Sequence, residues 1–167
     1  MQDLIDWESK YGTIPKGAVV LMNAGWSSKY PNKTAVFGTS TPDDPSTFHF
    51  PGFHEDAGDW LVKNRNIHVL GTDTPSIDYA QSTTFPNHVL LGNANIPGLE
   101  NVANLDMIPE KGAMIYVAPI KLLDGSGGPA RVFATKSLYP VGASNALSSN
   151  KVFSVGLVVV ALSLAKH

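Results

Sequence analysis

Residues 54–71 read HEDAGDWLVKNRNIHVLG, and this stretch contains the two patterns that decide the fold. Ala57, Trp60 and Leu61 have helical spacing, and the acidic pair at positions 55 and 56 complements the N-terminal end of a helix dipole. A helix is therefore predicted over residues 54–64. The run 67–71 is short, apolar and closed by a glycine, which is typical of a strand. A helix that leads into a strand indicates an α/β protein.

Further short apolar runs, separated by glycine and proline, extend the strand pattern on both sides of this stretch. They predict strands over residues 18–23, 113–122 and 131–135. The sequence DGSGGP at 124–129 is interpreted as a tight turn between the last two strands, and it lacks the lysine of a phosphate-binding loop. The expected fold class is α/β, with a mixed β-sheet and flanking helices in a single domain.

The composition excludes several classes of function. The 167 residues include 12 Lys and Arg against 14 Asp and Glu, so the net charge is −2, and no basic run is present. Binding of nucleic acid through a basic surface is therefore not expected. The chain has no cysteine, which excludes disulfides, thiolate zinc sites and cysteine nucleophiles. Any metal must be held by His, Asp, Glu or water.

The C-terminal region differs from the rest of the chain, because residues 152–165 form an uncharged and mostly apolar run. We expect a domain over 1–136, a polar linker over 137–151 and a hydrophobic tail over 152–167. The tail is short for a transmembrane helix, which needs about 18 or more apolar residues. It fits a glycolipid-anchor signal behind the small residues at 142–146, or alternatively a buried terminal strand or helix. An artefact of the gene model is a third interpretation.

Signals for cellular location are otherwise weak. The first residues, MQDLIDWESKYG, do not have the pattern of a signal peptide, whereas the glycosylation sequon at 32–34 is compatible with export. We expect an extracellular or membrane-anchored protein that associates with the membrane through its tail, with a cytoplasmic location as the alternative.

Five histidines are the candidates for acid–base or metal chemistry. His68 alternates within an apolar strand and His167 is the last residue, so neither is expected at a site. His49 and His54 flank a Phe-Pro-Gly-Phe turn at the start of the expected helix, where a ring can cap backbone groups or face a cleft. Of these two, His49 is kept as a candidate site residue.

His88 is more informative, because Glu100 follows it by twelve residues and a loop–strand return could bring the two side chains together. An imidazole nitrogen and a carboxylate oxygen suit a divalent transition metal, but two ligands are too few for a closed site. The alternative is that the histidine caps backbone groups and that the glutamate pairs with a lysine or arginine on the surface.

Several blocks of sequence occur in a recognisable order. They are WE at 7–8 with GTIPKGAVVL at 12–21 and GW at 25–26, HFPGF at 49–53, GTDTPSID at 71–78, His88 with GLEN at 98–101, and GSGGPARV at 125–132. Together they resemble the cyclase-like metal-dependent hydrolases, the family of isatin hydrolases and bacterial-type kynurenine formamidases. The resemblance covers residues 7–134 and implies a mixed sheet of the swivelling β/β/α type, a homo-oligomer and a divalent metal, Mn²⁺ or Zn²⁺.

The resemblance also assigns roles to individual residues. His88 and Glu100 fall on the positions that ligate the second metal in two-metal members. Trp26, Phe53 and Ser76 would lie at the pocket for an aromatic amide. Asp73, together with Ser76 and Asp78, would shape the loop beside the active-site cleft.

The chain departs from the family at one point. The motif His-x-Gly-Thr-His-x-Asp-x-Pro-x-His, which supplies the first-metal ligands and the acid–base histidine, is not present. The chain thus resembles the C-terminal portion of a family domain. We therefore expect its fold to be an incomplete domain. The expected function is metal-dependent hydrolysis of an arylformamide of the N-formylkynurenine type or a cyclic amide of the isatin type, with the truncated chain inactive. The alternatives are a non-catalytic, membrane-anchored binding or scaffold homologue and an incomplete gene product.

Overall fold

The strand β1 (Val19–Asn23) is apolar from Val19 to Met22 because both of its faces are covered. The computed structural model describes residues 1–136 and 159–163, and it pairs β1 in parallel with β2 (Val69–Thr72) and with β6 (Val159–Ser163). The short strand β3 (Gly98–Leu99) extends this sheet beyond β2, so the strand order is β3-β2-β1-β6.

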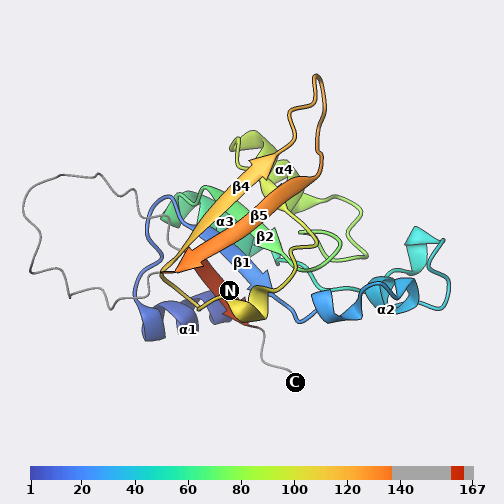
Figure 1. Cartoon of the computed structure of the whole chain (residues 1–167), viewed down its shortest axis with the longest axis horizontal. Helices are drawn as coiled ribbons and strands as arrows, with labels where there is room; N and C mark the ends of the chain where they lie inside the picture. Colours follow the sequence, from blue (N-terminus) through green and yellow to red (C-terminus); the bar gives the residue numbers. More distant parts are fainter. Residues whose placement is uncertain (137–158, 164–167) are drawn as a thin grey trace, which may run out of the picture.

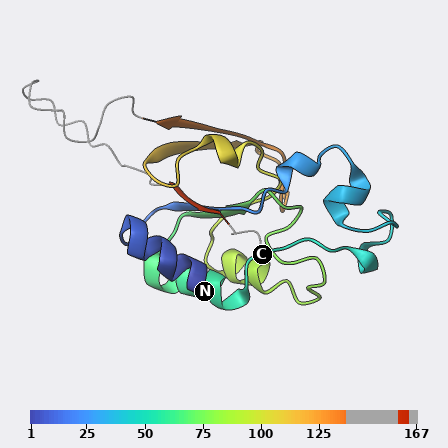
Figure 2. The same ribbon diagram turned by 90° about the horizontal axis from the view of Figure 1, so that it is seen from below.

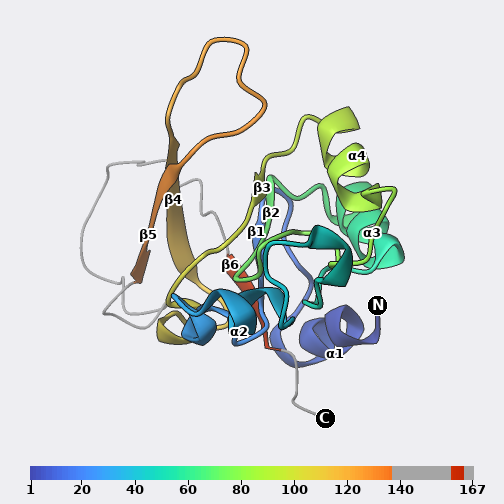
Figure 3. The same ribbon diagram turned by 90° about the vertical axis from the view of Figure 1, so that its right-hand side faces the viewer.

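Three helices cover one face of the parallel sheet, as Figures 2 and 3 show: α1 (Gln2–Tyr11), α3 (Glu55–Arg65) and α4 (Pro86–Asn93). Their apolar side chains meet alternate residues of β1 and β2 in a helix-side core. Its members include Leu4, Trp7, Val20, Met22, Phe53, Leu61, Leu70, Ile77 and Leu91.

An antiparallel hairpin of β4 (Ala113–Pro119) and β5 (Ala130–Lys136) covers the opposite face of the sheet (Figure 1). The hairpin-side core includes Val19, Leu21, Val69, Leu99, Val102, Leu105, Ala113 and Ile115. Because Val19 and Leu21 face the hairpin while Val20 and Met22 face the helices, the alternation along β1 builds both cores. The layers are sheet, sheet and helix, which confirms the expected α/β class.

Four short elements lie in the connections. They are η1 (Ser27–Lys29), α2 (Lys33–Phe37), η2 (Pro45–Thr47) and η3 (Leu105–Met107). The first three follow β1 and form a lobe at one side of the molecule (Figure 1).

Most of the elements expected from the sequence are present. The strands expected over 18–23, 67–71, 113–122 and 131–135 correspond to β1, β2, β4 and β5, and residues 124–129 lie in the loop between β4 and β5. The helix expected over 54–64 is α3, and His54 caps it, since its Nδ1 accepts a hydrogen bond from Asp56 N at 3.2 Å. The sequence assigned no element to His88, and the structure places it in helix α4, from which the chain returns through β3 to Glu100.

The expected linker over 137–151 lies outside the described residues, as does most of the tail. Within the tail, residues 159–163 form β6 at the edge of the parallel sheet, which corresponds to the terminal-strand alternative for these five residues. In the part of the chain that the structure describes, no helix combines the length and hydropathy needed to cross a membrane.

An ion pair between Glu8 of α1 and Arg65 of α3 ties two helices together. Arg65 donates from Nε to Oε1 at 2.6 Å and from Nη2 to Oε2 at 2.7 Å, and Ile14 N also donates to Oε1. Both side chains are largely buried, with exposed fractions of 16% for Glu8 and 21% for Arg65. The hydrogen bonds from Arg65, against the effect of partial burial, hold the pKa of Glu8 below its ordinary value.

Replacing Glu8 by glutamine should therefore lower the free energy of unfolding by about 2 kcal/mol at pH 7. A carboxylate whose folded pKa is lowered stabilises the fold above its unfolded pKa, and this contribution disappears as the pH falls through the lowered value. The difference between wild type and Glu8→Gln should thus shrink below about pH 4. Urea unfolding at pH 7 and at pH 3 measures both effects.

The matched control is the exposed pair of Asp59 and Lys63 on α3, whose side chains are 44% and 68% exposed. Asp59→Asn should change the free energy of unfolding by less than about 0.5 kcal/mol. Equal effects of the two substitutions would contradict the role given to Glu8.

Candidate functional site

Several of the candidate residues lie beyond the carboxyl ends of the parallel strands, the edge at which open α/β sheets commonly bind ligands. Trp26 follows β1, Asp73 and Asp78 follow β2, and Glu100 comes directly after β3. His88 reaches the same region from the first turn of α4. Parallel pairing of β1, β2 and β3 is what brings these separate loops to one edge.

The best-defined part of this region is the contact between His88 and Asp78. Nδ1 of His88 lies 2.7 Å from Oδ2 of Asp78, and the backbone N–H of His88 donates to the same oxygen at 3.2 Å. The other oxygen, Oδ1, accepts from Asn87 N at 2.9 Å and from Asn87 Nδ2 at 2.8 Å. Asp78 is completely buried, so these partners take the place of water.

The Asp78 carboxyl is held in its ionised form by these contacts. Burial alone would raise its pKa, but the hydrogen bonds from His88 and Asn87 outweigh burial and keep the pKa of Asp78 below its ordinary value. Because two of the donors are N–H groups in the first turn of α4, Asp78 also caps this helix from a distant part of the chain.

The opposite ring nitrogen of His88 faces Glu100. Nε2 lies 3.1 Å from Oε1 of Glu100, and Ile77 N donates to the same oxygen at 3.2 Å. The side chains remain accessible, with exposed fractions of 43% for His88 and 33% for Glu100. The structure therefore brings together the two residues that the sequence paired across a twelve-residue spacing.

The hydrogen-bond roles at His88 explain what this arrangement can do. With Nδ1–H donating to Asp78, a neutral ring presents a lone pair at Nε2, and an ionised Glu100 presents only lone pairs. Two acceptors 3.1 Å apart need a proton or a cation between them. Imidazole nitrogen and carboxylate oxygen are ligands for divalent transition metals, so the donor set suits such an ion.

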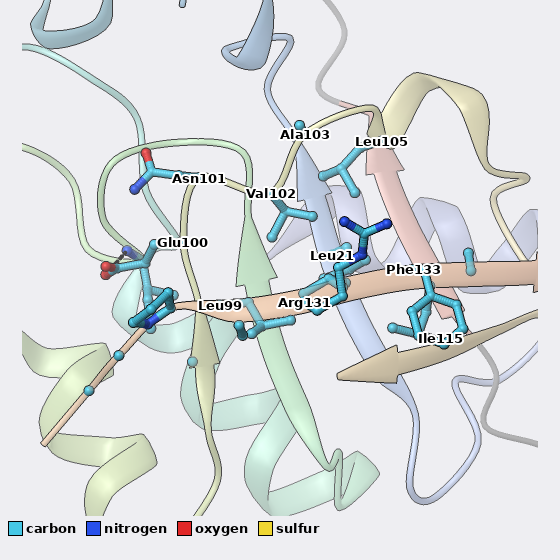
Figure 4. A pocket seen from close by; sticks show the side chains of 18 of the residues that line it. Leu21, Leu99, Glu100, Asn101, Val102, Ala103, Leu105, Ile115, Arg131 and Phe133 are labelled. Carbon is cyan, nitrogen blue, oxygen red and sulfur yellow. Dashed lines mark hydrogen bonds between the residues drawn. The ribbon is translucent and has the colours of Figure 1, made fainter. Parts of the chain in front are cut away.

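A cavity of about 1020 Å³ opens beside this pair, between the parallel sheet and the β4–β5 hairpin. Figure 4 shows Glu100 and Asn101 together at one side of the cavity, and Leu21, Leu105 and Ile115 at the other. His88 also belongs to the lining. A cavity of this size, lined by both apolar and polar side chains, is suited to a small organic ligand.

The structure places Trp26 away from the lining of this cavity. Its indole N–H donates to Val36 O at 2.7 Å, and Lys29 Nζ lies 4.1 Å from the centre of a ring of the indole. Its backbone N–H donates to the buried Asp73, as do those of Ala24 and Ser27. Asp73 thus shapes the loop after β1, and a role of Trp26 in substrate binding stays a prediction.

The other candidates for substrate binding also lie outside the cavity lining. Phe53 is buried in the helix-side core, where its carbonyl accepts from Asn87 Nδ2 at 2.8 Å. Ser76 Oγ accepts from Asp78 N at 3.2 Å. His49 is exposed, and its Nδ1 lies 2.7 Å from Thr47 O. The structure does not bring His49 to the His88–Glu100 pair.

Sequence reasoning missed two parts of this region. Asn87 is completely buried and contacts Asp78, yet its only signal in the sequence is its position next to His88. Tyr30 donates from Oη to Oδ1 of Asn101, which joins the lobe after β1 to the residue after Glu100. No cluster of three or more His, Asp or Glu side chains suited to a metal occurs within residues 1–136 and 159–163.

Comparisons with known proteins show what the chain as a whole is similar to. The family model described as putative cyclase matches residues 1–79. The isatin hydrolase of Roseibium aggregatum is 34% identical over 137 residues, which are 79% of this chain and 50% of that protein. The kynurenine formamidase of Polaromonas naphthalenivorans is 37% identical over 71 residues, which are 42% of this chain and 31% of that protein.

Comparison of the fold with solved structures also finds isatin hydrolases. The solved structure of isatin hydrolase A from Ralstonia solanacearum has a TM-score of 0.72 and 38% identity, and the match covers 78% of this chain and 50% of that one. The chain spans about half the length of the isatin hydrolases that it matches. In sequence and in fold, the chain is therefore similar to the cyclase-like hydrolases, and it matches about half of an isatin hydrolase.

Proposed function

We propose that this chain supplies the His88–Glu100 part of a divalent-metal site in a hydrolase of aromatic amides. The substrate class is a cyclic amide of the isatin type or an arylformamide of the N-formylkynurenine type, and the metal is Mn²⁺ or Zn²⁺. The observation that carries the proposal is the 3.1 Å separation of two atoms that can both ligate a metal, Nε2 of His88 and Oε1 of Glu100. The names of the isatin hydrolase and kynurenine formamidase relatives support the substrate class.

The chain's own residues have distinct tasks in this proposal. His88 and Glu100 would hold the cation, and a bound divalent cation can polarise an amide carbonyl and lower the pKa of a bound water. Ile77 N holds one oxygen of Glu100 in place, and Asp78 holds the ring of His88. Leu21, with the other apolar residues of the cavity, would exclude water around an aromatic ring.

Two protein ligands do not complete a metal site, since zinc sites in enzymes use three protein ligands and a water. We therefore propose that the 167-residue chain has negligible turnover by itself. The alternative function is a non-catalytic binding or scaffold homologue, which would retain the fold and the cavity without hydrolysis. Homo-oligomer formation and membrane association through the tail remain proposals, to be measured by light scattering and by flotation with vesicles.

The metal site is tested by titrating the full chain with Zn²⁺ and with Mn²⁺ in a calorimeter. We expect weak binding at one site, and we expect His88→Ala and Glu100→Gln each to reduce the affinity at least about tenfold. The exposed His68 is the control, and His68→Ala should leave the affinity unchanged. Unchanged binding in both His88→Ala and Glu100→Gln would contradict the site.

Turnover is measured with isatin and with N-formylkynurenine, in the presence of Mn²⁺ or Zn²⁺. We expect no hydrolysis above the rate without protein. Multiple turnovers that are abolished by a chelator and by His88→Ala would overturn the prediction of inactivity and would show that the chain is a complete enzyme. Metal binding without turnover would agree with the proposed partial site.

A further inference from the structure

We propose that Asp78 is a positioning residue, which keeps the proton of the neutral His88 ring on Nδ1 and thereby presents the Nε2 lone pair to a cation beside Glu100. The part of this inference that concerns the cation rests on the proposed function. The position of the proton on the His88 ring does not depend on it. Its basis is the pair of contacts that Asp78 Oδ2 makes with His88, from the backbone N–H at 3.2 Å and from Nδ1 at 2.7 Å. These two contacts fix both the ring and the backbone that carries it.

The carboxylate can perform this role because it accepts hydrogen bonds and cannot donate them. An acceptor beside Nδ1 requires the ring proton at Nδ1, and the lone pair is then on Nε2. If an amide nitrogen stood in the place of Oδ2, Nδ1 would have to accept instead, and the proton would move to Nε2. Nε2–H could then donate to Glu100 but could not bind a cation.

Asp78 is itself held by a buried amide. Asn87 Nδ2 donates to Asp78 Oδ1 at 2.8 Å and to Phe53 O at 2.8 Å, so it connects Asp78 to the backbone beside α3. A side chain at Gly58 of α3 would collide with Oδ1 of Asn87. The close packing of α3 against α4 therefore holds the side chain of Asn87, whose amide donates to Asp78.

This arrangement gives a role to two buried residues, Asp78 and Asn87, which a ligand cannot reach. Asp78 and Asn87 are completely buried, whereas His88 and Glu100 are partly exposed beside the cavity. Carboxylates behind metal-binding histidines commonly increase metal affinity 10- to 100-fold by orienting the ring. Asp78 would thus act through His88, and it would not touch the substrate or the cation.

The decisive variant is Asp78→Asn, which keeps the size of the side chain. Nitrogen NMR of the histidine rings should show the neutral His88 ring protonated at Nδ1 in the wild type and at Nε2 in Asp78→Asn. The dissociation constant for Zn²⁺ should rise about 10- to 100-fold in the variant. Val89→Ala, a change on the exposed side of the same helix, should alter neither the tautomer nor the affinity.

A general loss of stability must be distinguished from a change at His88. Asn87→Ala removes a buried amide from the same cluster but leaves Asp78 in contact with His88, so it should lower stability while the proton stays on Nδ1. If Asp78→Asn does not fold, the wild-type protein still provides the test. A neutral His88 ring protonated at Nε2 in the wild type would overturn the inference.

The two proposals fail in different ways. If His88→Ala leaves Zn²⁺ binding unchanged, the metal site is wrong, and the position of the ring proton is unaffected by that result. If Zn²⁺ binds at His88 but Asp78→Asn changes neither tautomer nor affinity, the positioning role is wrong and the metal site remains.

Discussion

Replacing Gly52 by alanine should lower the free energy of unfolding by about 3 kcal/mol or more, which is a large part of the roughly 5–15 kcal/mol of an ordinary domain. A β-carbon at this position would collide with Tyr79 N and with the carbonyl carbon of Asp78, and it would lie 2.7 Å from Ile77 O. All three obstacles are backbone atoms, so a change of rotamer cannot relieve the collision. The two segments would have to separate.

Separation is costly because the segments are joined by backbone hydrogen bonds on both sides of Gly52. Phe53 N donates to Ile77 O at 2.8 Å, and Ala80 N donates to Phe50 O at 3.1 Å. Moving residues 77–79 would also move Asp78, and with it the hydrogen bonds to His88. Loss of stability and a disturbed His88 ring should therefore occur together.

The measurement is urea unfolding of Gly52→Ala and of a matched control, Gly92→Ala. No atom lies within 4 Å of a β-carbon built at Gly92, which is in α4. Alanine is preferred over glycine in a helix by up to about 1 kcal/mol, so Gly92→Ala should be neutral or stabilising. A Gly52→Ala protein as stable as the wild type would show that the two backbones do not approach closely.

The sequence was sufficient for the strands β1, β2, β4 and β5 and for the helix α3. β1 and β2 are short apolar runs without charge, and such runs are most stable when buried on both faces of a parallel sheet. In helix α3 the apolar residues have helical spacing, and Glu55 and Asp56 in the first turn complement the helix dipole. In these elements the local pattern and the tertiary contacts favour the same structure.

Helices α1 and α4 were not predicted, for different reasons. In α1 the buried residues are Leu4 and Trp7, and the polar residues around them hide this short apolar face. In α4 the apolar residues Val89, Leu90 and Leu91 are consecutive, which gives no helical period. Pro86 at the first helical position was the available signal.

The candidate site could be predicted only in part. The spacing of His88 and Glu100, interpreted through a family resemblance, selected two side chains that lie 3.1 Å apart. The contact between His88 and Asp78 could not be derived from spacing, because it depends on how the loop after β2 meets the first turn of α4. The positions of Trp26 and Phe53 depend in the same way on tertiary packing, which composition and periodicity do not determine.

A second large effect is expected from Asp73→Ala, which should lower the free energy of unfolding by about 3 kcal/mol. Asp73 is completely buried, and its carboxylate accepts hydrogen bonds from the backbone N–H groups of Ala24, Trp26 and Ser27. Alanine would leave these three partly buried donors without their acceptor. The loop after β1 would then lose the contact that holds it to the end of β2.

Amide hydrogen exchange separates this local effect from general unfolding. In Asp73→Ala the amides of Ala24, Trp26 and Ser27 should exchange faster than in the wild type, under conditions in which the buried amides of β1 remain protected. The control is Asp44→Ala, which removes an exposed carboxylate that accepts from Ser46 N at 3.0 Å. Its unfolding midpoint should stay close to that of the wild type, because water can replace an exposed acceptor.

The outcome for Trp26 decides what Asp73 contributes to the site. If exchange rises only at the three amides while the indole N–H of Trp26 keeps its hydrogen bond to Val36 O, Asp73 holds the backbone alone. If the indole is released as well, Asp73 also sets the position of the Trp26 side chain and hence any part that it has in binding an aromatic substrate. Unchanged exchange at all three amides would contradict the proposed role, since a carboxylate that anchors three donors cannot be removed without exposing them.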